Sequence, residues 1–295
     1  MKNKTAVAVL CAALGNIIWG FSLLFTKMGI SVVGDPNILL AHRFTVSTLV
    51  MLCMMLAGKG SVSFKGKNWR PVAVLLLMQL CYYLFESYAL LYTNSTMAGL
   101  VLAVVPVVTV GTGALFLKEY PTKRQGLFCL LPVAGVILIS VSGKELGVMT
   151  PLGGFFLLLT LLSSAIYKTV NRQSASEFSP FERTFLVLAI SAVTFSVIGL
   201  RAADWSVARF VAPLAEPKYL LAVLVLGLLC SIAANMLVNY AMSEMSVFKV
   251  SSFGSLSTLC SALAGIVFLK EPINVSLALG GVLILVGVRQ VTKPK

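Results

Sequence analysis

Phe116-Leu117-Lys118-Glu119 returns 152 residues later as Phe268-Leu269-Lys270-Glu271, and the sequence around this corner repeats with it. Aligned without gaps, residues 88–136 and 240–288 are identical at 11 of 49 positions. Apolar composition alone would produce some of these identities. Four consecutive matches at a junction between two apolar segments are much harder to obtain by chance. We therefore interpret the chain as an internal duplication.

The composition is that of an integral membrane protein. The 295 residues are 58% hydrophobic and 11% charged, with a mean hydropathy of +0.96, whereas a soluble domain carries about 25% charged residues. The six cysteines all lie in apolar runs and none has CxxC spacing, so we expect free, buried thiols. A single histidine, His42, cannot build a metal site alone, and we expect no cofactor.

Ten segments are apolar and long enough to cross the ~30 Å hydrocarbon layer as helices. Three of them begin with a capping residue followed by proline, at Asp35-Pro36, Thr150-Pro151 and Ser179-Pro180. The predicted fold is therefore all-α, with ten transmembrane helices at roughly 5–31, 37–57, 71–92, 95–117, 125–142, 151–170, 184–200, 219–242, 246–268 and 274–290.

The distribution of basic residues predicts the orientation. With the N-terminus in the cytoplasm, 15 of the 23 Lys and Arg residues lie inside, five lie outside and three lie in or at the edge of spans. This bias satisfies the positive-inside rule with both termini cytoplasmic. The net charge of +13 is thus mainly a topology signal. The basic residues are dispersed and lack interleaved aromatics, which argues against nucleic-acid binding.

Two repeats of five helices must be inserted in opposite orientations, because five is odd. We expect a first repeat over residues 1–143 and a second, inverted repeat over residues 144–295. Inverted repeats give a transporter two related gates around one midplane site, and exchange of their conformations yields alternating access. A non-transporting membrane scaffold is the alternative.

Several short motifs, in their order and spacing, resemble the EamA family of the drug/metabolite transporter superfamily. These are Trp19-Gly20, Arg43-Phe44, Tyr88-Ala89-Leu90, Pro106 and the two Leu-Lys-Glu corners. The resemblance implies ten helices in two inverted repeats, a cavity lined by helices 1–4 and 6–9, and a multi-pass protein of the prokaryotic plasma or inner membrane. It also implies movement, usually outward, of amino acids, other metabolites or toxic compounds. Ser164-Ala165 and Thr258 depart from the first repeat, so the two gates need not work identically.

Two opposite charges lie at similar depth in the predicted bundle. Arg43 is about seven residues into the second helix, and Glu86 is about six residues from the outer end of the third. Charges inside a membrane are costly and usually functional. In one interpretation Arg43 attracts a substrate carboxylate while Glu86 attracts an amine or carries a proton. In the other, the two residues form a salt bridge between helices.

Polar side chains also recur at helical spacing. Gln79, Tyr82, Tyr83 and Glu86 share one face of the third helix, which suits a cavity wall better than a headgroup belt. Ser231, Asn235 and Asn239 share a face of the eighth helix, where they either line the cavity or bond between helices.

Three further residues are candidates on weaker grounds. Trp19 is a cavity aromatic or a packing residue, and only the family resemblance favours the cavity. Ser255 lies on a polar face of the ninth helix that could line a pore. Pro106 would leave a carbonyl unpaired and kink the fourth helix, which makes it a candidate gating hinge.

These features favour a secondary transporter that exports a small, amino-acid-like metabolite. A multidrug exporter is the alternative within transport, and an intramembrane enzyme is the alternative outside it. The sequence contains no constellation of base, nucleophile or metal ligands, so we expect no enzymatic activity. Expected partners are the small-molecule substrate, membrane lipids and a proton as coupling ion, with the protein a monomer or a homodimer.

Overall fold

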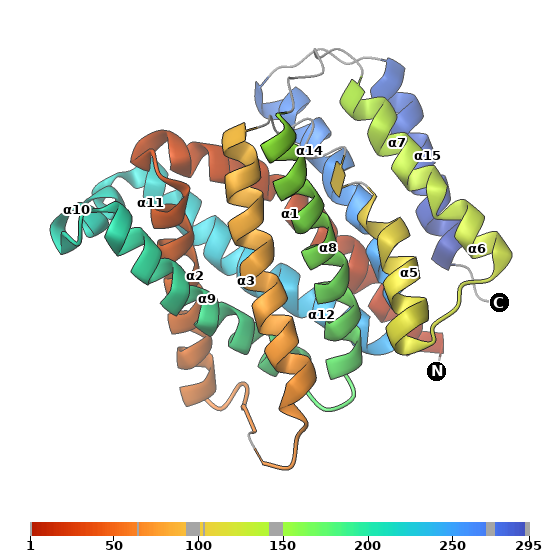
Figure 1. Cartoon of the computed structure of the whole chain (residues 1–295), viewed down its shortest axis with the longest axis horizontal. Coiled ribbons are helices and arrows are strands. Elements are labelled where there is room, and N and C mark those ends of the chain that lie inside the picture. Colours follow the sequence, from red (N-terminus) through yellow and green to blue (C-terminus); the bar gives the residue numbers. More distant parts are fainter. Residues whose placement is uncertain are drawn as a thin grey trace.

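The protein is a bundle of helices packed side by side (Figure 1). This computed structural model describes residues 2–63, 65–92, 101–102, 104–141, 150–269 and 275–292. The sequence Asn94-Ser95-Thr96 also predicts a tight turn between two spans. This turn and the second corner beyond Leu269 lie outside these residues, as do the side chains of Leu23 and Lys27.

Helices account for nearly all of the described chain. The first half contains α1 (Lys2–Val33), α2 (Pro36–Leu56), α3 (Trp69–Tyr92), α5 (Val105–Leu117), α6 (Lys123–Phe128) and α7 (Leu130–Val141). The second half contains α8 (Pro151–Ser174), α9 (Pro180–Ala202), α10 (Val207–Val211), the 3₁₀ turn η1 (Ala212–Ala215), α11 (Pro217–Leu224), the π-helix η2 (Val225–Ala233), α12 (Ala234–Glu244), α13 (Val247–Ser252), α14 (Gly254–Leu269) and α15 (Val275–Thr292).

Within the described residues, five helical stretches are long and apolar enough to cross a membrane by themselves, so the chain is a multi-pass membrane protein. They are residues 4–33, 36–56, 151–174, 180–202 and the continuous run 217–244. The predicted caps are confirmed, since Asp35, Thr150 and Ser179 each accept a hydrogen bond from the first turn of the helix that follows. Ser179 and Glu182 form the reciprocal bonds of a capping box.

Four predicted segments are interrupted rather than continuous, and one of them, 125–142, is broken at Cys129 between α6 and α7. The segment 219–242 contains the π-helix η2, and the segment 246–268 is broken at Phe253 between α13 and α14. In the segment 95–117, α5 begins at Val105, and Pro106 occupies its first turn instead of kinking a longer described helix. A proline in a first turn leaves no additional amide unpaired, because those N–H groups have no acceptor in any helix.

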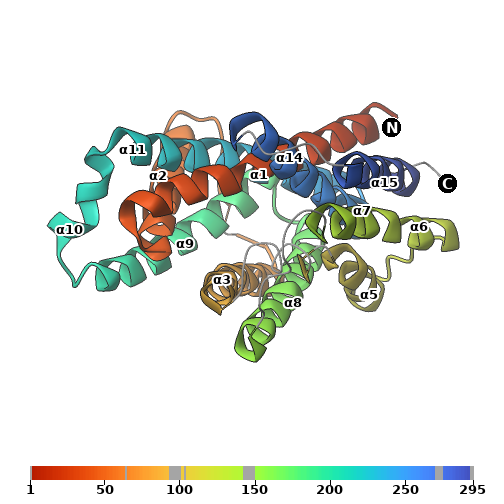
Figure 2. The ribbon, with the colours of Figure 1, turned by 90° about the horizontal axis from the view of Figure 1, so that it is seen from above.

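Two helix pairs pack in antiparallel fashion. The start of α2 meets the end of α9, where Ala41 lies against Gly199, and Gly60, just after α2, lies against Phe181 at the start of α9. Likewise α7 and α15 lie together at one end of the molecule (Figure 2), where Pro132 contacts Gly287.

The remaining large contacts occur in corresponding pairs. Helix α3 packs along α8, and α12 packs along α1; similarly α5 packs against α8, and α14 against α1. If three pairs of predicted spans are exchanged, the first with the sixth, the third with the eighth and the fourth with the ninth, each of these contacts becomes its counterpart. The packing therefore repeats itself between the two halves of the chain.

Candidate functional site

Arg43 is buried near the centre of the contact between α2 and η2. Its Nε donates to Ser231 Oγ at 2.7 Å, and its guanidinium carbon lies 5.3 Å from the centre of the Phe44 ring. Ser47, one turn later, donates to the Arg43 carbonyl at 2.6 Å and to the Gly227 carbonyl at 3.0 Å. These bonds hold the arginine on η2 rather than on a carboxylate.

The π-helical stretch of η2 supplies carbonyl groups to neighbouring side chains. Trp19 Nε1, on α1, donates to the Cys230 carbonyl at 2.9 Å, and Asn235 Nδ2 donates to the Ser231 carbonyl at 2.8 Å. A π-helix shifts the register of the helical bonds and often marks a functional site. Trp19 thus helps to anchor α1 to the segment that holds Arg43.

The predicted stripe on α3 lies against this region. Tyr82 Oη donates to Glu86 Oε1 at 2.8 Å, and the Tyr82 and Tyr83 rings meet edge to face at 5.3 Å. Gln79 is buried and hydrogen-bonds Tyr83. Glu86 therefore has a phenol as a neighbour, which satisfies one carboxylate oxygen without neutralising the charge.

Aromatic rings form a wall beside the two charges. Tyr83 lies 5.0 Å from Phe44 and 6.2 Å from Phe195, and Phe44 lies 5.7 Å from Phe195. Aromatic pairs at such distances are stabilised beyond the area they bury. The wall joins α2, α3 and α9, so it comes from both halves of the chain.

Arg43 and Glu86 interact electrostatically but form no ion pair. Each lies within the other's electrostatic reach, yet the three ion pairs found among the described residues, all within 4.0 Å, do not include this one. Each of the two charges is bonded to a neutral hydroxyl, Arg43 to that of Ser231 and Glu86 to that of Tyr82. Arg43 and Glu86 therefore do not link α2 to α3 through a direct salt bridge.

The other predicted residues lie apart from this pair. Asn239 is buried and fully bonded, accepting from Asn171 at 2.7 Å and donating to Thr184 at 2.8 Å, which fits the expectation of bonding between helices. Ser255 is buried in the first turn of α14, and Pro106 is buried in the first turn of α5.

Comparison with known proteins identifies the family. The profile of the EamA-like transporter family matches residues 6–141 and again residues 151–292. The chain belongs to the EamA-like transporter family. Its relatives are transporters rather than enzymes, and a transporter acts on a small-molecule substrate.

Individual relatives of this EamA-like transporter support the assignment over its full length. The uncharacterized transporter YcxC of Bacillus subtilis is 34% identical over 98% of this chain and 93% of its own. An uncharacterized transporter of Archaeoglobus fulgidus is 25% identical over 98% of this chain and 97% of its own. One solved crystal structure has the same fold, with a TM-score of 0.76, 22% identity and coverage of 97% of this chain and 98% of the other.

A second polar network crosses the EamA-like bundle near the ends of α8 and α12. Arg183 is fully buried, and its guanidinium donates to the Asn171 and Asn239 carbonyls at 2.9 and 2.8 Å and to Ser243 Oγ at 2.6 Å. Ser231, Asn235, Asn239 and Ser243 follow one another every four residues. Ser231 contacts Arg43, whereas Asn239 and Ser243 contact Arg183 near the end of α12.

The same end of the molecule is tied together by carboxylates. Glu119, after α5, pairs with Arg172 at 3.0 Å and accepts from the Val247 amide at 2.8 Å. Glu182 accepts from Lys67 Nζ at 2.6 Å and from the Ser63 amide at 2.8 Å. Each carboxylate joins the first half of the chain to the second.

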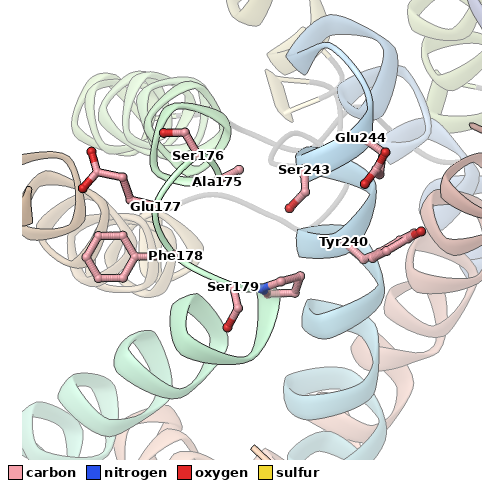
Figure 3. Close-up of a pocket in the computed structure, with 9 residues that line it drawn as sticks. Ala175, Ser176, Glu177, Phe178, Ser179, Tyr240, Ser243 and Glu244 are labelled. Atoms are coloured by element: carbon pink, nitrogen blue, oxygen red, sulfur yellow. The ribbon is translucent and has the colours of Figure 1, made fainter. Parts of the chain in front are cut away.

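A shallow cavity of about 290 Å³ lies beyond this network, between the loop 175–179 and the end of α12 (Figure 3). Ser243 lines it, and the same hydroxyl accepts from Arg183. Arg43 and Glu86 do not line this cavity.

Charge counting alone missed the structural role of these residues. It assigned Arg172 and Arg183 to the cytoplasmic loops, because both lie near the end of an apolar segment. Two signals were available in the sequence: Glu119 belongs to the repeated corner, and Glu182 belongs to the capping box.

Proposed function

We propose that this protein is a secondary transporter that exports a small, amino-acid-like metabolite by alternating access. The observation that carries the proposal is the Arg43 and Glu86 pair. Two opposite charges lie inside the bundle, each bonded to a neutral hydroxyl and not to the other. A zwitterion satisfies both, since its carboxylate suits the guanidinium and its amine suits the carboxylate.

The proposed architecture is ten transmembrane helices in two inverted repeats, residues 1–143 and 144–295. Two lines of packing support it. The spans that correspond in the two repeats, α2 with α9 and α7 with α15, run antiparallel, as an in-plane twofold requires. The contacts of α3 with α8 and of α12 with α1 exchange under the same operation. The two matches of the family profile agree with repeated halves.

The proposed orientation has both termini in the cytoplasm of a prokaryote, which follows from the excess of basic residues at that end. In this orientation the ties made by Glu119 and Glu182 close the cytoplasmic end. This structure then corresponds to the state in which substrate cannot leave toward the cytoplasm, and the Arg183 network lies between the substrate site and the cavity in Figure 3.

Transport of a defined mixture tests this proposal. Purified protein is reconstituted into liposomes loaded with the 20 common L-amino acids, and release is followed by mass spectrometry with and without a proton gradient. We expect release of one or a few amino acids, and none from liposomes that contain the R43A variant. Release of no amino acid by the wild-type protein would refute the proposal.

A multidrug exporter is the second candidate, and the aromatic wall of Phe44, Tyr83 and Phe195 favours it. Flat aromatic cations stack on such surfaces and pair with a buried carboxylate. Efflux of a fluorescent cationic dye from cells that overproduce the protein distinguishes this candidate. Efflux of the cationic dye should require Glu86 and should not depend on Arg43, whereas amino-acid export should require both residues.

A further inference from the structure

Lys168 is an interior-facing lysine for which the described part of the chain provides no partner. It follows Leu157, Leu161 and Ser164 at helical spacing on α8, and these three residues are buried. The opposite face of the same helix carries exposed apolar side chains, those of Phe155, Leu158 and Leu162. Lys168 therefore points into the bundle and not toward lipid.

A break between α13 and α14 lies directly opposite this lysine. A methyl group added at Gly254, the first residue of α14, would lie 3.8 Å from Lys168 Nζ. Phe253 interrupts the helix, and α14 begins at Gly254. The first amides of a helix carry partial positive charge and favour an anion.

Two buried hydroxyl groups flank the break. Ser251 Oγ has no hydrogen-bond partner within the described ranges, and its residue is 1% exposed. Ser255 is 4% exposed, and its hydroxyl has no partner among the described residues. The two serines lie on either side of the break, Ser251 in α13 and Ser255 in the first turn of α14. In contrast, the neighbouring Ser252 and Ser257 donate to the Lys249 and Gly254 carbonyls.

We infer that Lys168, Ser251, Ser255 and the first turn of α14 form an inner subsite for the carboxylate of the substrate. Every group in this cluster can donate a hydrogen bond, and among the described residues neither Lys168 nor the Ser251 hydroxyl has a partner. An unpaired lysine and an unpaired hydroxyl in a membrane interior are costly unless an anion completes them. The arginines nearby differ, because Arg43, Arg172 and Arg183 each donate to acceptors of the chain.

The depth of this subsite indicates the order in which an exported substrate would contact it and Arg43. Lys168 is six residues before the end of α8 and Gly254 is seven residues after the start of α13, so both lie about 10 Å inside the proposed cytoplasmic end. This inference rests on the proposed export of an amino-acid-like substrate. The carboxylate of an exported molecule engages the inner subsite first and Arg43 second.

Protection of Lys168 from chemical modification tests the subsite without a known substrate. The full-length protein in lipid nanodiscs is treated with a small amine-acylating reagent, and the modification rate of each lysine is measured by peptide mass spectrometry. Acetate should slow the reaction at Lys168 by about threefold when two thirds of the sites are occupied. Acetamide, which has the same shape without the charge, should not slow it.

Two controls keep the result specific. Lys249, on α13, reports any general effect of acetate on the reagent, and its rate should not change. The S251A/S255A variant should lose the protection at Lys168 while its unfolding temperature stays near that of the wild type. Equal rates at Lys168 with acetate and acetamide, or full protection in the S251A/S255A variant, would overturn the inference.

The liposome experiment separates this inference from the proposed function. K168M should lower the release of a transported amino acid at least tenfold, the loss expected for a charge-assisted hydrogen bond, whereas K249M should not. Acetate protection without amino-acid release leaves the anion subsite standing and refutes the proposed substrate. Amino-acid release that K168M leaves unchanged refutes the subsite and leaves the proposed function standing.

Discussion

Glu119 and Arg172 form an ion pair of 3.0 Å that joins the end of α5 to the last turn of α8. The second oxygen of Glu119 accepts from the Val247 amide at 2.8 Å, at the start of α13. Arg172 also donates to the carbonyls of Met242 and Ser243. One carboxylate and one guanidinium therefore hold four helix ends of an EamA-like transporter together.

The first prediction is that E119Q weakens this closure. The variant keeps the shape of the side chain but removes the charge that binds Arg172, so the state open to the cytoplasm should become more populated. In a background without the six native cysteines, S164C reports access from the cytoplasmic side in inside-out vesicles. Its reaction with an impermeant thiol reagent should become about threefold to tenfold faster, as expected for a partly exposed ion pair.

The exposed pair of Asp204 and Arg209 provides the matched control. It is shorter, at 2.6 Å, but both side chains are largely exposed, and it lies within one half of the chain. D204N should leave the S164C reaction unchanged. An equal acceleration by E119Q and D204N would mean that loss of any acidic side chain opens the protein, and the closing role of Glu119 would be wrong.

The second prediction concerns the buried guanidinium of Arg183. R183A leaves Asn171, Asn239 and Ser243 without their donor in a buried network, so it should destabilise the protein by about 3–5 kcal/mol. The measurement is the free energy of unfolding in detergent micelles. R201A removes an exposed arginine from the end of the same helix, α9, and should change stability by less than about 0.5 kcal/mol. Similar losses for the two variants would contradict a structural role for the Arg183 network.

The sequence predicted the elements of this fold well, because hydrophobic length and capping chemistry act locally. The caps at Asp35, Thr150 and Ser179 are examples. It did not predict the π-helix at 225–233 or the break at Phe253, because both depend on which neighbours satisfy the backbone. A helical face cannot be read across a π-helix with a constant period, since its register shifts.

The sequence predicted only part of the candidate site. Arg43 and Glu86 could be found from the sequence, because charged residues are rare inside apolar membrane-spanning segments. Sequence spacing could not separate Asn235, which bonds to η2, from Asn239, which belongs to the Arg183 network. That distinction depends on α8 and α9, which are distant in sequence.

The third prediction is that R43A abolishes transport while the protein stays folded. It removes the guanidinium that we propose binds the substrate carboxylate, and it frees one hydroxyl, that of Ser231. Amino-acid release from liposomes should fall to the level of empty liposomes, with an unfolding temperature within a few degrees of the wild type. S231A removes the same hydrogen bond but keeps the charge, so it should retain most of the flux. Wild-type flux in R43A would remove Arg43 from the substrate site.

The fourth prediction concerns proton coupling through Glu86. E86Q removes the group that can bind and release a proton, so release should no longer respond to a proton gradient. The measurement is the initial rate of release at several external pH values with the internal pH held constant. Y82F is the matched control, because it removes the donor at 2.8 Å but leaves the carboxylate able to titrate. A pH profile of E86Q that matches the wild type would assign Glu86 to substrate contact or to structure.

The fifth prediction tests the close contact between α7 and α15. A methyl group added at Gly135 would lie 2.5 Å from the Gly280 carbonyl oxygen, and one added at Gly280 would lie 2.6 Å from the Gly135 carbonyl oxygen. Backbone atoms cannot rotate away, so G135A should force the helices apart at a cost of about 1–3 kcal/mol. G111A, on α5, meets open space and should not lower the unfolding temperature. Because α7 and α15 lie at one end of the molecule, away from α2, the helix that carries Arg43, the flux per folded G135A molecule should stay near the wild-type value. A transport defect without a loss of stability would instead make this helix pair part of the moving machinery.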